Sequence, residues 1–184
     1  LLRKVFENLL GANNPETKET ARNQSGSFYT PREIVQYMVN ESLVAHLKRT
    51  VGDKLEDKFR QLLDFTTQDV ELTDEQKHQI VHALFTCKIL DPACGSGAFP
   101  MGMLQQMVHI LRQVDPNNEQ WREVLLEMAS DDSRRAFGIS DEEERNKKLD
   151  EIKNTFNNAL NSPDYTRKLY IIESCIYGVD IQPI

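Results

Sequence analysis

The residues best suited to bind a ligand form one run, Asp-Pro-Ala-Cys-Gly-Ser-Gly-Ala-Phe at positions 91–99. A short apolar segment at 88–90 precedes the run and a long apolar segment at 101–114 follows it, which predicts a buried strand, a glycine turn and a helix. This order places a strand-end carboxylate, Asp91, and two glycines beside the start of a helix. Small polar ligands that carry an adenosine are commonly held in such places.

A second carboxylate, Asp180, follows the next predicted strand, at 176–180. In a doubly wound sheet, an acid at that position accepts hydrogen bonds from both ribose hydroxyls of a bound adenosine. Asp180 lies 83 residues after Gly97 (97 to 180), whereas dinucleotide-binding folds place the acid ~20 residues after the glycines. A helical insertion at about 115–162 accounts for the excess. Taken alone, either the glycine turn or Asp180 is also typical of an ordinary turn after a strand.

The charge of the turn distinguishes between two adenosine ligands. A nicotinamide dinucleotide fingerprint requires a third glycine three residues after Gly97, and Pro100 stands there instead. Asp91 suits the ammonium group of S-adenosylmethionine and is unfavourable beside a pyrophosphate. The sequence therefore favours S-adenosylmethionine as the cofactor.

Three segments together resemble amino-methylating DNA methyltransferases of the N6-adenine group. Residues 91–99 resemble their S-adenosylmethionine-binding motif, Gly-Ser-Phe-Tyr-Thr-Pro at 26–31 resembles the motif that precedes it in the chain, and Tyr-Gly-Val-Asp-Ile-Gln-Pro at 177–183 resembles the ribose-binding motif that follows. The whole run is similar to large bacterial restriction–modification methyltransferases of type IIG, in which one polypeptide combines methylation with target recognition and often with a nuclease.

The resemblance implies roles for individual residues. The segment 28–30 closes over the methionine end of the cofactor, with Thr30 near its carboxylate, and the turn lines the methionine and sulfonium side. Asp180 holds the ribose and Ile181 packs on the adenine. The complete set of expected cofactor-binding residues is Phe28, Tyr29, Thr30, Asp91, Pro92, Ala93, Cys94, Gly95, Ser96, Gly97, Phe99, Asp180 and Ile181.

The resemblance also implies a catalytic motif that this chain lacks. In the family, Asn/Asp-Pro-Pro-Tyr/Phe follows the ribose acid, accepts hydrogen bonds from the target amino group and stacks on the flipped base. No such tetrapeptide occurs in the 184 residues, so no catalytic residue is expected here. We expect a segment of a longer protein that cannot transfer a methyl group alone, and an assay showing adenine methylation by this chain would refute this.

The remaining sequence is mostly helical in pattern. Thr30 is expected to be the N-cap of a helix to about 49, with Pro31 at its first position, Glu33 completing a capping box, and an apolar stripe of Val35, Val39, Leu43 and Leu47. A Thr73–Gln76 capping box and a Ser140–Glu143 cap predict the starts of two further helices. Helices are expected at 1–10, 30–49, 53–65, 73–86, 99–114, around 121–128, 140–160 and 162–174, with strands at 88–92 and 176–180.

These elements predict an α/β fold, the N-terminal portion of a Rossmann-like methyltransferase fold that is rich in helices. Residues 1–87 would form a helical N-terminal extension carrying the Phe-Tyr-Thr-Pro motif, and residues 88–184 the first part of the S-adenosylmethionine-binding domain. Two strands do not make a stable sheet alone, so the sheet is expected to be incomplete within this chain.

The amino-acid composition bears on whether the chain binds DNA or a membrane and on its cellular compartment. The formal charge is −7, whereas a chain that grips DNA phosphates by itself is basic, so duplex DNA would be bound mainly by regions absent from this chain. No stretch approaches the ~20 apolar residues of a membrane span. Three cysteines without paired spacing, Cys87, Cys94 and Cys175, argue against a disulfide framework or a zinc site and favour the cytoplasm.

Other interpretations rank lower. His78 and His82 have the spacing of a zinc protease motif, but Gln79 stands where the general base Glu is required, which predicts surface or packing roles for both and no metal site. Cys94 has no histidine partner for nucleophilic catalysis. Two alternatives remain open: a fragment of a nicotinamide-dinucleotide oxidoreductase, and a non-enzymatic helical scaffold or DNA-recognition module.

Overall fold

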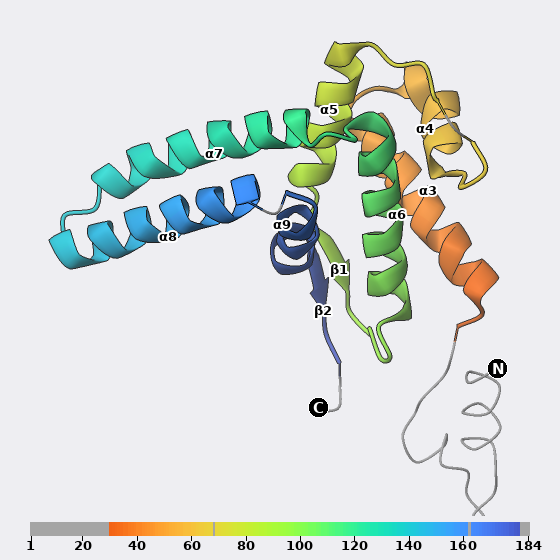
Figure 1. The fold of residues 1–184 in the computed structure, drawn as a ribbon. Helices are drawn as coiled ribbons and strands as arrows, with labels where there is room; N and C mark the ends of the chain where they lie inside the picture. The colour runs from red at the N-terminus through yellow and green to blue at the C-terminus, as the bar shows by residue number, and fades with distance from the viewer. Residues whose placement is uncertain (1–29, 68, 162, 181–184) are drawn as a thin grey trace, which may run out of the picture.

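The computed structural model of the chain describes residues 30–67, 69–161 and 163–180. The predicted helix at 1–10 and three expected cofactor contacts, Phe28, Tyr29 and Ile181, lie outside these residues. Figure 1 shows a body of packed helices beside two strands, with a long helical arm projecting from it. In chain order the elements are α3 (Arg32–Thr50), η1 (Asp53–Leu55), α4 (Glu56–Leu63), α5 (Asp74–Phe85), β1 (Ile89–Asp91), α6 (Ala98–Val114), α7 (Glu119–Phe137), α8 (Glu142–Asn161), α9 (Pro163–Tyr170), η2 (Ile171–Cys175) and β2 (Ile176–Gly178).

The two predicted strands pair in parallel and form the sheet of the described residues. Ile89 aligns with Ile176, and Leu90 aligns with Tyr177. Ile89 is buried and Ile176 half-buried against the helices, whereas Leu90 and Tyr177 on the opposite face are exposed. The chain is therefore helix-rich with a small parallel sheet, as expected of part of an α/β fold, and its helices cover one face of that sheet.

One hydrophobic core joins the helices before β1 to those after it. Most of its members come from α3, α4, α5, α6 and α7, and β1 and η2 also contribute. They include Val39, Leu43, Leu47, Phe59, Ile80, Leu84, Ile89, Met103, Met107, Leu111, Trp121 and Ile171. The helices α3 and α6 cross closely at Gly102, where an added Cβ would lie 3.1 Å from the Cγ2 of Val39. The predicted segments 1–87 and 88–184 thus share this core in their described parts.

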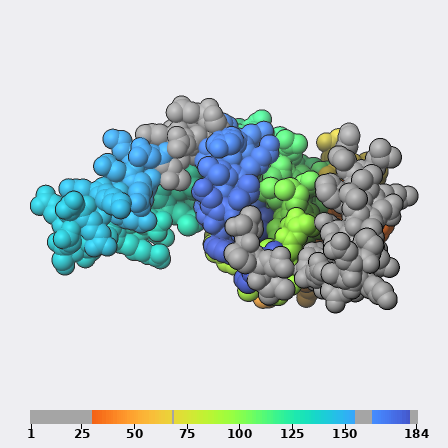
Figure 2. All heavy atoms as spheres, turned by 90° about the horizontal axis from the view of Figure 1, so that it is seen from below, coloured from red at the N-terminus to blue at the C-terminus, as the bar shows by residue number. Residues whose placement is uncertain are grey.

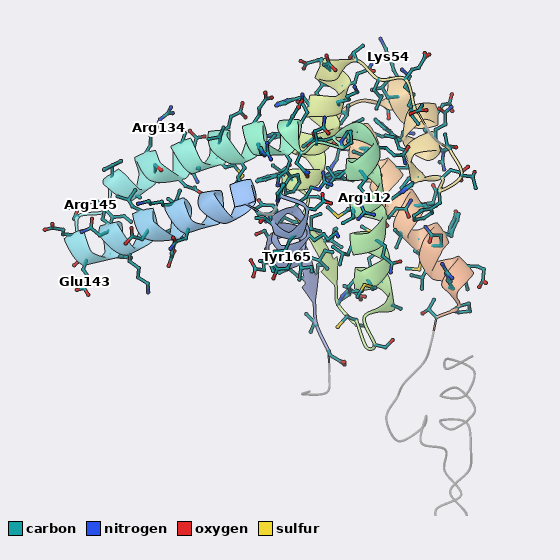
Figure 3. The ribbon with its side chains drawn as sticks, in the orientation of Figure 1. Lys54, Arg112, Arg134, Glu143, Arg145 and Tyr165 are labelled. Carbon is teal, nitrogen blue, oxygen red and sulfur yellow. The ribbon has the colours of Figure 1, made fainter. Side chains whose placement is uncertain are left out.

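The predicted insertion forms the projecting arm. The helices α7 and α8 run side by side in opposite directions, and the tip lies far from the strands (Figures 1 and 2). Arg134 and Arg145 lie along the arm in Figure 3, and Arg145 donates a hydrogen bond of 3.1 Å to the carbonyl of Ile139 at the tip. The arm returns the chain to α9, and η2, a π-helix, connects α9 directly to β2.

Most predicted elements are confirmed, and the differences occur at their ends. The capping box is present: the amide of Gln76 donates to the Oγ1 of Thr73, and the Oε1 of Gln76 accepts from the Thr73 amide. The predicted helix at 53–65 divides into η1 and α4, the strands are shorter than predicted, and the predicted last helix ends in η2. The predicted Ser140 cap is wrong, because the amide of Glu144 donates to the Oδ1 of Asp141, and aspartate caps helices as well as serine does.

The predicted Thr30 cap is also wrong. The cap of α3 is Pro31, whose backbone is extended and whose carbonyl accepts from the amides of Ile34 (3.1 Å) and Val35 (3.0 Å). The helix begins one residue later than predicted, at Arg32, and has no side-chain cap. Thr30 therefore lies outside the helix, and a capping role does not compete with its predicted role in ligand binding.

A buried polar cluster joins the α6–α7 connection to α9. Asp115 is 3% exposed, and its carboxylate accepts from the amides of Gln120 (3.2 Å) and Trp121 (2.9 Å). Arg167 is 1% exposed and donates to the backbone carbonyl of Asp115 (3.1 Å) and to the Oδ1 of Asp164 (3.2 Å). The cluster anchors the base of the arm to the helix that leads into β2.

Candidate functional site

The carboxyl edge of the sheet brings Asp91 and Asp180 onto the same side of the molecule. The amide of Val179 donates to the carbonyl of Asp91 (2.9 Å), and the carbonyl of Val179 accepts from the amide of Cys94 (2.9 Å). These bonds extend the parallel pairing beyond β2 and connect it to the glycine turn. Asp180 directly follows Val179, so both acids flank the turn at one edge of the sheet.

The glycine turn adopts a backbone conformation that other residues disfavour. Gly95 has φ +47° and Gly97 has φ +76°, both in the left-handed region. An added Cβ at either glycine would meet no atom of the described residues within 4 Å, so these residues leave open space beside the turn. Glycine is therefore favoured at these two positions by the left-handed backbone conformation, and packing would leave room for a side chain.

The turn presents hydrogen-bond donors that the described residues do not use. The amide of Gly97 donates to the carbonyl of Cys94 (2.8 Å), whereas the amides of Gly95, Ser96 and Ala98 donate to no acceptor in the described part of the chain. Asp91 shapes the start of the turn, because its Oδ1 accepts from the amide of Ala93 (3.1 Å) and its side chain is half-buried. The arrangement offers a carboxylate for a cationic group and amides for an anionic or hydroxyl group.

A cavity of about 680 Å³ lies between the glycine turn, the start of α3, the first turns of α6, and the starts of η2 and β2. Thr30 lines one side, Ser96 and Gly97 line another, and much of the remainder is apolar, including Met101 and Ile172. Its volume lies within the ~300–1,000 Å³ of small-molecule and cofactor sites. The cavity brings Thr30 and the glycine turn together although they are far apart in the sequence.

Other predicted residues occupy different positions. Pro92 and Ala93 are exposed in the turn, and Cys94 packs against Gly178 of β2. Phe99 is half-buried and packs against the hydrophobic core. Asp91 and Asp180 lie at the strand edge and do not line the cavity, so a ligand that used all of these groups would extend from the cavity across the turn.

Several lining residues were missed by the sequence prediction. Arg32, Val35 and Gln36 reach the cavity from the first turns of α3. Arg32 carries the signal that could have identified it, since it is a cation two residues after Thr30. Ile172 carries no such signal, because its position depends on the wide turn of the π-helix η2.

Gly178 is needed because Cys94 lies against it. A Cβ at position 178 would lie 3.0 Å from the Sγ and 3.1 Å from the Cβ of Cys94. Gly178→Ala is expected to displace the glycine turn and to lower the free energy of unfolding by about 1–2 kcal/mol, as overpacking does. Urea denaturation measures this, and a Cys94→Gly change in the same chain should recover most of the loss. An unchanged unfolding midpoint for Gly178→Ala would contradict the expectation.

The three cysteines are free and differ in their surroundings. Burial raises the pKa of Cys175 from 9.0 to about 11 and also raises the pKa of Cys87. The neutral thiols therefore stabilise the folded chain below pH ~9, and this contribution falls as the pH rises towards 11, where the unfolded thiols ionise first.

The different environments predict selective alkylation. At pH 8, iodoacetamide should modify half-buried Cys94 and leave Cys87 and Cys175 unmodified, because the thiolate is the reactive form and both are buried. Peptide mass spectrometry of the labelled chain measures this. Equal labelling of all three thiols in the folded chain would contradict it.

No group of His, Cys, Asp and Glu side chains in the described residues is arranged to hold a metal ion. None of the described helices has both the length and the apolar composition of a membrane span. Comparisons with protein-family models, curated proteins and solved structures found no match. A function for this chain therefore has to be argued from its own residues and their geometry.

Proposed function

We propose that this chain binds S-adenosylmethionine at the glycine turn and provides the cofactor-binding part of an N6-adenine DNA methyltransferase. The observation that carries the proposal is the parallel pairing of β1 with β2, since it brings Asp91, the turn and Asp180 to one edge. In open α/β sheets, ligands bind at the carboxyl ends of the strands. The proposal includes a Rossmann-like fold, of which β1 and β2 are the first two strands.

The available groups match the charges of the cofactor. The carboxylate of Asp91 would accept from the ammonium group, and the amides of Gly95, Ser96 and Ala98 would donate to the carboxylate or to a hydroxyl. Asp180 would accept from the ribose hydroxyls. A pyrophosphate would meet the negative charge of Asp91, and for this reason we favour S-adenosylmethionine over a nicotinamide dinucleotide.

In this proposal the chain binds and orients the methyl donor, and other residues act on the DNA. S-adenosylmethionine supplies an electrophilic methyl group on a sulfonium. The adenine must leave the duplex to reach it, and most of the rate enhancement comes from positioning. The sequence has no Asn/Asp-Pro-Pro-Tyr/Phe motif, and its net charge of −7 does not favour DNA. Base flipping, methyl transfer and the DNA grip therefore require residues that these 184 do not include.

Isothermal titration calorimetry with the 184-residue chain tests the proposal. S-adenosylhomocysteine, the stable product form of the cofactor, should bind one molecule per chain, and NAD⁺ should not bind. Binding of NAD⁺ without S-adenosylhomocysteine would favour the oxidoreductase alternative. Binding of neither would favour the scaffold alternative and would refute the proposal.

Alkylation of Cys94 provides a second readout of the same site. Cys94 is part of the turn, so saturating S-adenosylhomocysteine should slow the reaction of the Cys94 thiol with iodoacetamide. Adenosine monophosphate at equal concentration is the matched control. An unchanged rate under conditions where calorimetry shows binding would locate the ligand elsewhere.

A further inference from the structure

Arg32 lines the cavity and is a cation that has no partner among the described residues. It is the first residue of α3 and is exposed, and it lines both this cavity and a neighbouring cavity of about 610 Å³. Ion pairs in the described residues join Arg60 to Glu41 and to Glu56, among others, but none includes Arg32. No hydrogen bond of its guanidinium occurs within the described part of the chain.

The surroundings of Arg32 favour an anion on the side of the glycine turn. Ser96, Gly97 and Ala98 line the same cavity, and the unused amides of Ser96 and Ala98 are also donors. On the other side, Glu33 and Asp64 line the neighbouring cavity. Asp64 is already engaged, because its Oδ1 accepts from the amide (2.8 Å) and hydroxyl (2.7 Å) of Thr66. The guanidinium thus lines the same cavity as several donors and has no acceptor among the described residues.

We infer that Arg32 binds the carboxylate of the methionine end of the cofactor, which makes it a specificity-determining residue of the site. The inference rests on the proposed function. A guanidinium presents a planar fork of N–H donors that matches a carboxylate. Arg32 and the amides of the turn then hold the carboxylate, while Asp91 accepts from the ammonium on the strand side. The two charges of the amino-acid end are recognised by groups of opposite charge.

This arrangement predicts discrimination between two adenosine thioethers. S-adenosylhomocysteine carries the amino-acid end, and 5′-methylthioadenosine lacks it. Loss of the Arg32 charge should weaken only the first ligand, because the second has no carboxylate to bind. A purely structural role of Arg32 in α3 would weaken both ligands equally.

Calorimetric titration of both ligands into wild type, Arg32→Met and Arg32→Lys tests the inference. Arg32→Met should weaken S-adenosylhomocysteine about 10–30-fold and leave 5′-methylthioadenosine unchanged, as expected for a lost charge-assisted hydrogen bond. Arg32→Lys should recover part of the loss, because it keeps a cation without the bidentate fork. Arg49→Met, an exposed arginine at the other end of α3 that does not line the cavity, is the matched control and should change neither affinity.

The outcomes separate this inference from the proposed function. Wild-type affinity of Arg32→Met for S-adenosylhomocysteine, or an equal loss for both ligands, overturns the role of Arg32 and leaves the proposed function standing. Absence of S-adenosylhomocysteine binding by the wild-type chain overturns both.

Discussion

Asp91→Asn is expected to weaken S-adenosylhomocysteine binding about 30-fold without changing the thermal stability of the chain. Asparagine keeps an oxygen that accepts from the amide of Ala93, so the turn retains its local hydrogen bond. It removes the negative charge that faces the ammonium group. A hydrogen bond to a charged group contributes about 2 kcal/mol, which corresponds to this loss of affinity. Calorimetry measures the affinity, and differential scanning fluorimetry measures the stability.

The control for this prediction is Asp57→Asn on α4, where an exposed acid is neutralised away from the site. It corrects for the change in net charge and should leave the affinity at the wild-type value. Equal affinities of Asp91→Asn and wild type would contradict a direct contact between Asp91 and the ammonium group. A large loss of stability in Asp91→Asn would instead indicate that the carboxylate is needed for folding.

Arg167→Met is expected to lower the free energy of unfolding by about 3 kcal/mol. The guanidinium is buried, and its removal leaves the buried backbone carbonyl of Asp115 without its donor and takes away the positive charge near the carboxylates of Asp164 and Asp115. A buried acceptor that loses its donor costs the desolvation free energy of that group, and a buried carboxylate is less stable without a nearby positive charge. Methionine fills similar space, so the loss reports the charge and the hydrogen bonds more than a cavity. Urea denaturation followed by circular dichroism measures the change.

Two further variants test this explanation. Arg134→Met on the arm removes an exposed arginine that pairs with Asp131, and should change stability by less than ~0.5 kcal/mol (Figure 3). Asp115→Asn combined with Arg167→Met should recover part of the loss, because it neutralises a buried carboxylate that has lost the nearby positive charge of Arg167. A loss of less than ~1 kcal/mol in Arg167→Met alone would show that the cluster is not a major source of stability.

Features that depend on residues close to one another in the sequence could be predicted from it. The capping box of Thr73 and Gln76 needs only residues three apart, and the structure confirms it. The glycine turn was predicted because a strand, two glycines and a helix follow one another directly. The placement of the two strands side by side required more than local patterns, since 84 residues separate the end of β1 from the start of β2 (91 to 176, exclusive), and the structure shows that the strands are neighbours.

Features that depend on tertiary packing could not be predicted. The contact between Gly178 and Cys94 depends on how closely the turn approaches β2, which no local pattern encodes. Ile172 reaches the cavity because a π-helix joins α9 to β2, where the periodicity of the sequence suggested only an ordinary helix end. Arginine usually lies at the surface of a protein, so no sequence pattern indicated that Arg167 is buried. Its burial follows from the packing of α9 against the α6–α7 connection.

In the proposed function, the glycine turn and the segment after β2 bind the same ligand molecule. This shared binding is tested most directly by titrating S-adenosylhomocysteine into the ¹⁵N-labelled chain and following backbone amides by nuclear magnetic resonance. The amides of Gly95, Ser96 and Gly97 should shift together with those of Val179 and Asp180, with one common dissociation constant. Shifts confined to one of the two segments, or two different dissociation constants, would contradict a shared site.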